Sequence, residues 1–166
     1  METPPSRQRG ATLIVGLLFL LVLTLLGAAA MRTSHLELKM SGNVMQKTVS
    51  FQESEDAREI AEASIRAIVD NINSGGSFPA SQAGMYDVAG GEQRPDVTDP
   101  DFWADSDNYI EVNSYNRYVV EYLGRKTVTL DDRSTTRDMH VFRISVLGIG
   151  TDGISQTLAQ TVFMER

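Results

Sequence analysis

The side chains that most often carry catalysis or bind transition metals are sparse in this 166-residue chain. Cysteine is absent, which excludes thiol catalysis and thiolate metal sites. The two histidines, His35 and His140, lie far apart in the sequence and belong to no metal-binding motif, and we place His140 at the edge of a strand. The run Gly148-Ile149-Gly150 lacks the third glycine of a phosphate-binding loop. We therefore predict that the protein is not an enzyme.

Carboxylates are plentiful, but nothing in the sequence pairs two of them in an apolar site. One acidic cluster surrounds the pair Phe102-Trp103, and it consists of Asp96, Asp99, Asp101, Asp105, Asp107 and Asn108. Asp105, Asp107 and Glu111 alternate with other residues in a way that suits calcium, which prefers oxygen ligands. The spacing lacks the glycine and the terminal glutamate of an EF-hand loop. We favour the alternative, a solvated acidic loop held by a buried aromatic pair, and expect no cofactor other than this weak calcium candidate.

The longest uniform stretch of the chain is apolar and lies near the N-terminus. Residues 11–31 are 21 consecutive residues without a charge, with Arg7 and Arg9 before them and Arg32 after them. At about 1.5 Å per residue, a helix of this length spans roughly 32 Å, enough to cross the hydrocarbon core of a bilayer. The run is therefore a membrane segment or a targeting signal.

Three interpretations of this run remain open on physical grounds. A secretory signal peptide would be cleaved near Ala28-Ala29-Ala30, although its apolar part is usually about 7–15 residues long. An uncleaved anchor would keep its basic end in the cytoplasm and export the rest. A third kind of signal would be cleaved on the cytoplasmic side of the apolar run.

The third interpretation follows from a resemblance. Gly10-Ala11-Thr12-Leu13-Ile14 resembles the prepilin junction of type IV pilins, and the residues beyond it resemble the pattern of PilX-type minor pilins: Ala30-Met31-Arg32, Met40-Ser41-Gly42-Asn43, Phe51-Gln52 and Glu55. The resemblance implies that prepilin peptidase cuts after Gly10 and methylates Ala11. It also implies an inner-membrane protein with a cytoplasmic N-terminus and a periplasmic domain, which later joins the tip of a pilus.

Val15 stands where most pilins have a glutamate. In that family the carboxylate pairs with the amino terminus of a neighbouring subunit, because an unpaired charge in an apolar core is costly. A subunit with valine there suits a position at or near the filament tip, or Val15 is simply one more lipid-facing residue. Gly16 and Gly27 would permit close contacts between helices. The partners implied are other minor pilins, the major pilin and a PilY-type tip adhesin, whose docking surface we expect to include residues 75–108.

Beyond the membrane segment, the pattern predicts one helix and a sheet. Residues 32–74 contain no proline and end at Asn73-Ser74-Gly75-Gly76, although Gly42 could bend or break the helix. An apolar stripe at helical spacing consists of Ala57, Ala61, Ile65, Ile68 and Ile72. Residues 75–108 form a long polar connection with two Gly-Gly pairs. Strands are predicted at 109–113, 117–124, 139–149 and 154–163, with a tight turn at 150–153 and an exposed loop at 131–137.

In the third of these strands, one set of side chains alternates with another, which predicts one buried face and one wet face. The buried set is Phe142, Ile144 and Val146, and the wet set is Val141, Arg143 and Ser145. The helix stripe would cover the buried face. We therefore predict an α+β, pilin-like fold: a leader (1–10), a transmembrane helix (11–31), its amphipathic continuation (32–74), and a head (75–166) with a roughly four-stranded antiparallel sheet.

Composition limits the alternatives. The net charge is −7, and without residues 1–10, which hold two arginines and one glutamate, it becomes −8. With no basic stripe to neutralise phosphates, nucleic-acid binding is not expected. Two functions outside the type IV pilus stay open: a membrane-anchored periplasmic binding or sensing domain, and a minor pseudopilin of type II secretion.

Overall fold

A computed structural model of the protein describes residues 8–130 and 135–166. One helix, α1 (Gln8–Asn73), accounts for the N-terminal part, and it continues unbroken through Gly42. The chain divides into two compact units, residues 1–44 and 45–166, which are described separately. The described part of the first unit consists of α1 alone, and every side chain from Thr12 to Val44 is exposed.

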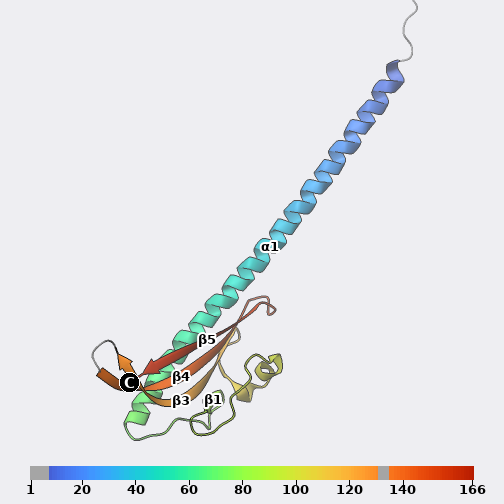
Figure 1. Ribbon diagram of the computed structural model, residues 1–166. Helices are drawn as coiled ribbons and strands as arrows, with labels where there is room; N and C mark the ends of the chain where they lie inside the picture. Colours follow the sequence, from blue (N-terminus) through green and yellow to red (C-terminus); the bar gives the residue numbers. More distant parts are fainter. Residues whose placement is uncertain (1–7, 131–134) are drawn as a thin grey trace, which may run out of the picture. The chain divides into compact units, whose positions relative to one another are not determined.

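In its described residues, the second unit contains the C-terminal part of α1 and one sheet of five strands (Figure 1). The strands are β1 (Met85–Asp87), β2 (Ile110–Asn113), β3 (Asn116–Leu130), β4 (Thr135–Ile149) and β5 (Gln156–Glu165). Their order is β1-β3-β4-β5, and β2 also pairs with β3. All pairs are antiparallel except β1 with β3. The predicted α+β, pilin-like class is thereby confirmed.

The sheet differs from the prediction in three respects. It has five strands rather than four, because β1 lies in the segment predicted as a plain connection and pairs in parallel with β3. That segment also holds two short 3₁₀ helices, η1 (Pro100–Ala104) and η2 (Ser106–Asn108). Residues 135–137, predicted as loop, begin β4, while residues 131–134 lie outside the described part of the chain.

One face of the sheet packs against α1. Ala57, Ala61 and Ile65 are fully buried as predicted, whereas Ile68 and Ile72 are only partly buried. The fully buried Val69 continues the stripe at the next helical turn. Opposite them, the sheet supplies the large apolar side chains of this core: Tyr118, Val120, Phe142, Ile144 and Val146. The apolar stripe therefore fixes which face of α1 meets the sheet.

The other face of β4, predicted to be wet, is instead largely buried. Leu147 and Ile149 on this face, together with Val119 of the neighbouring β3, pack with Trp103 and Tyr109, which residues 75–109 bring over the sheet. The Trp103 Nε1–H donates a hydrogen bond of 2.8 Å to the Val97 carbonyl, so the segment is also tied to itself. The prediction of a buried aromatic pair holds for Trp103, while the prediction of a wet sheet face is wrong.

Among the described residues, a glutamate and a histidine side chain are buried within the sheet. Glu121 is 1% exposed, and its Oε2 lies 3.1 Å from Nε of Arg94 and 3.6 Å from Nη1 of Arg143. His140 is 3% exposed and lies inside β4 rather than at a strand edge, because β4 begins five residues earlier than this histidine. These two buried groups depend on polar partners, since an unpaired buried charge or imidazole is costly.

Candidate assembly and docking sites

The first candidate site is the apolar surface of the membrane segment. By length and composition, the N-terminal part of α1 could cross a membrane. Val15 is 52% exposed, and a Cβ added at Gly16 or Gly27 would meet no other atom within 4 Å. Within the described residues of the first unit, the apolar side chains of this surface are exposed, so they are available to lipid or to other helices.

The predicted processing site lies at the start of this helix. Gly10 and Ala11 fall within α1, but their side chains are outside what the structure describes, as are residues 1–7 altogether. Cleavage after Gly10 and methylation of Ala11 therefore stay predictions.

The second candidate site is the contact between α1 and the turn end of the sheet, and small residues make it close. Ser50 and Ser54 are both fully buried on α1, and Ser50 Oγ hydrogen-bonds Thr157 Oγ1 at 2.8 Å. An added Cβ at Gly148 would lie 2.0 Å from the Ser50 carbonyl oxygen. Only glycine fits at this point, which locks α1 in register with β4 and β5.

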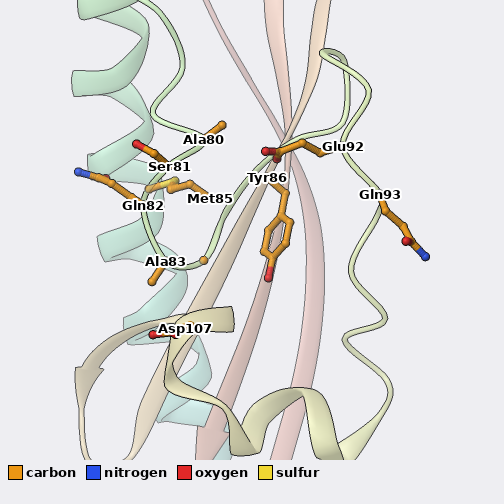
Figure 2. A pocket seen from close by; sticks show the side chains of 10 residues that line it. Ala80, Ser81, Gln82, Ala83, Met85, Tyr86, Glu92, Gln93 and Asp107 are labelled. Carbon is orange, nitrogen blue, oxygen red and sulfur yellow. The ribbon is translucent and has the colours of Figure 1, made fainter.

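The third candidate site is an acidic pocket of about 540 Å³ in the head. Three separate segments form it: residues 80–86, residues 92–93, and η2 with Asp107 (Figure 2). Figure 2 shows the Tyr86 ring between these segments, and its hydroxyl donates a hydrogen bond of 3.2 Å to the Asn108 carbonyl. The Glu92 carboxylate accepts the backbone N–H of Asp87, which ties two of the segments together.

The electrostatics of this pocket are negative. Glu92 and Asp107 line it, and no lysine, arginine or histidine does so among the described residues. The pKa of Tyr86 is raised, first by burial of the phenol and then by the negative charges of Glu92 and Asp105. The pocket therefore suits a neutral polar group or a cation, and it opposes anions.

The calcium candidates are spread over different elements. Asp105 caps η2, where its carboxylate accepts the Asp107 backbone N–H at 3.1 Å, and Glu111 lies exposed on β2. Within residues 8–130 and 135–166, no group of three His, Cys, Asp or Glu side chains is placed to hold a metal ion. Calcium binding stays an untested prediction, with the capping role of Asp105 as its structural alternative.

The sequence marked the 75–108 segment as a docking surface, but it did not reveal the pocket. The pocket cannot be predicted from any single stretch of the sequence, because Gln82, Glu92 and Asp107 come together only once β1 has paired with β3. His140, in the second unit, is enclosed by Tyr122 and Arg125. His35, in the first unit, is exposed on α1.

An N-terminal apolar helix of membrane-spanning length, continued by a helical stripe that packs on a mainly antiparallel sheet, defines the pilin-like class of α+β proteins. The family described as PilX N-terminal matches residues 9–66, so this stretch of the chain is similar to the N-terminal segment of PilX-type pilins. The match includes the junction at Gly10 and Ala11 and ends within α1, before the sheet begins. Comparison with curated proteins and with solved structures gives no match.

Proposed function

We propose that this protein is a minor pilin that primes assembly of the type IV pilus and sits at or near the filament tip. The observation that carries the proposal is the family match over residues 9–66, which spans the predicted cleavage junction and the whole apolar segment. The exposed apolar surface of that segment supports storage in a membrane and later packing against the helices of other pilins. PilX-type pilins are structural proteins, and a non-catalytic role follows.

The tip position rests on Val15. Within an apolar bundle of helices, a subunit without a carboxylate at this position cannot neutralise the amino terminus of a neighbouring subunit. Such a subunit suits the filament tip, where no earlier subunit has an amino terminus that a carboxylate must neutralise. Other minor pilins and the major pilin would then pack below it, and a PilY-type adhesin would dock on the head, with the acidic pocket receiving a basic side chain of the adhesin.

Processing by prepilin peptidase is tested by intact-mass measurement of the protein purified from membranes. We expect loss of residues 1–10 and one added methyl group on Ala11. Gly10→Glu should abolish both changes and reduce surface pili, while the matched control Gly42→Ala should leave processing unchanged. Retention of Met1, a new terminus at Met31, or normal maturation of Gly10→Glu would overturn the pilin proposal.

Because the chain has no cysteine, one introduced thiol labels it uniquely. Ile154 is 83% exposed at the turn before β5, so Ile154→Cys gives an accessible label. We expect fluorescence at one end of sheared pili. Label spread along the shaft would exclude the tip position and leave the pilin assignment intact.

A second candidate function is a membrane-anchored periplasmic binding domain, which the acidic pocket favours. It predicts an unprocessed N-terminus and no labelled filaments, so the same two measurements separate it from the first. A minor pseudopilin of type II secretion would be processed identically. Loss of secreted proteins rather than loss of pili on deletion would identify that function.

A further inference from the structure

The C-terminal strand β5 is an open edge of the sheet. It pairs with β4 on one side only, and the pairing runs without a bulge from Gln156 to Glu165. Residues 156–164 contain no charge and no proline. Natural sheets usually protect an exposed edge with lysine, proline, a bulge or a covering element, because an open edge invites another strand. Among the described residues, none of these devices protects residues 158–164, while at the start of β5 Lys47 of α1 covers the outward carbonyl of Gln156.

The backbone groups that face outward can be identified from the register. The Gly150 N–H donates to the Ser155 carbonyl, and the Ile149 N–H donates to Tyr115 on the β3 side. Because hydrogen-bonded and non-hydrogen-bonded pairs alternate in an antiparallel ladder, the odd-numbered residues of β5 pair with β4. The outward groups therefore belong to Leu158, Gln160, Val162 and Met164, and no described residue bonds them. The carbonyl of Gln156 also faces outward, as the alternation requires, because Lys47 Nζ on α1 donates a hydrogen bond to it.

The same residues carry exposed side chains. Ala159 and Phe163 pack toward the core that α1 covers, so the even-numbered side chains lie on the opposite face of the sheet. Leu158 is 39%, Val162 53% and Met164 45% exposed. Unpaired backbone groups and an apolar row thus coincide along one edge.

Two grooves flank the middle of this edge. One, of about 300 Å³, lies between α1 and β5 and includes Glu55 and Arg58. The other, of about 340 Å³, includes Arg143 and Val162. Both share Gln160 and Thr161, so they lie on either side of one backbone position. Successive side chains of an added strand would enter them alternately, with polar side chains meeting Glu55 and Arg58 and apolar ones meeting Val162.

We propose that the β5 edge binds an extended segment of another protein as a sixth strand, and that this segment alternates polar and apolar residues. Backbone hydrogen bonds to residues 158–164 would supply affinity, and the two grooves would select the side chains. The inference concerns the head alone and holds whether or not the protein enters a filament.

A second copy of this chain fits the edge less well. Ser50 contacts Thr157 and Arg66 contacts Glu165, so α1 and β5 run in the same direction within the second unit, residues 45–166. A symmetric pair formed through β5 would be antiparallel, and it would place the Met45 ends of the two helices at opposite ends of the joined sheet. If two chains were anchored in the same membrane, both helices would have to approach the joined sheet from the same end, which an antiparallel pair does not allow.

The test uses the full chain in detergent and a fluorescent peptide of alternating threonine and valine, about ten residues long to match β5 and flanked by lysines. Val162→Pro removes an outward N–H without touching the ladder to β4, and Val162→Thr keeps both the N–H and the branched shape. We expect fluorescence anisotropy to show binding that Val162→Pro weakens roughly tenfold or more and Val162→Thr changes less than about threefold. Val162→Lys, which places a charge on the edge, provides a second variant if proline lowers the melting temperature.

Hydrogen exchange supplies the position of binding. The bound peptide should slow exchange at the amides of Leu158, Gln160, Val162 and Met164 and leave residues 80–86 unchanged. Absence of binding, equal binding to Val162→Pro and Val162→Thr, or protection at the acidic pocket would overturn the proposal. A concentration-dependent dimer that Val162→Pro dissociates would overturn it in favour of a second copy.

Discussion

Substitution of Gly148 by alanine tests the close contact between α1 and the sheet. An added Cβ would lie 2.0 Å from the Ser50 carbonyl oxygen and 2.5 Å from the Ser54 nitrogen. Both are backbone atoms, so no side chain can rotate away. To restore a separation of 3.0 Å, below which Cβ contacts essentially do not occur, helix and strand must move apart by about 1 Å at this point.

Overpacking of a core by one methyl group usually costs about 1–3 kcal/mol, and a clash with two backbone atoms belongs at the upper end. Gly148→Ala should therefore destabilise the head by about 3 kcal/mol. For a unit of this size, that corresponds to a melting temperature lower by roughly 10 °C. Thermal melts of the full chain in detergent, followed by circular dichroism, measure the shift.

Two other glycines provide graded controls. At Gly150 the nearest atoms to an added Cβ are 3.0 Å away, and at Gly42 there is none within 4 Å. We expect Gly150→Ala to cost less than Gly148→Ala, and Gly42→Ala to be neutral or stabilising, because alanine is the better helix former by about 1 kcal/mol. If Gly148→Ala melted within 2 °C of Gly42→Ala, the close approach of α1 to β4 would be wrong.

Two further predictions concern the buried polar groups of the sheet. Glu121→Ala should lower the free energy of unfolding by about 2–3 kcal/mol, because Arg143 and Arg94 lose their partner. Arg94 is exposed, which keeps the cost below that of a fully buried ion pair. Urea titration measures the change. The pKa of His140 is lowered by burial and then by the charge of Arg125, so the unfolded chain binds a proton more readily than the folded one. Stability from this group is complete above the unfolded pKa of about 6.5 and is lost as the pH falls from there toward the lower folded pKa. The urea midpoint should drop between pH 7.5 and 5.5, and a drop of the same size in His140→Gln would refute this assignment.

The sequence predicted the helix and the positions of the main strands because their signals are local. Absence of proline and the spacing of Ala57, Ala61 and Ile65 indicate α1, and Gly75, with φ of 96°, ends it as expected. The ion pair between Glu62 and Arg66 is local in the same way, since the two residues lie four positions apart on α1 with 3.9 Å between Glu62 Oε2 and Arg66 Nη2. These features depend on residues within one or two helical turns.

The errors arose where distant segments meet. The predicted second strand ended at Gly124, whereas β3 continues to Leu130 through a register shift at which Gly124 has φ of 90°. β1 has only three residues, and its parallel pairing depends on β3 being in place. The wet face was predicted from β4 alone, but Trp103 arrives from another part of the chain to cover it. The acidic pocket escaped prediction for the same reason.

The parallel course of α1 and β5 has a mechanical consequence. Their contacts are distributed from the bond between Lys47 and Gln156 to the ion pair between Arg66 and Glu165. Tension applied to the helix at Met45, along its axis, would load these contacts together in shear instead of peeling them open one after another. β5 therefore holds the C-terminal part of α1 along its length. The contacts between these two elements should resist separation when force is applied at Met45.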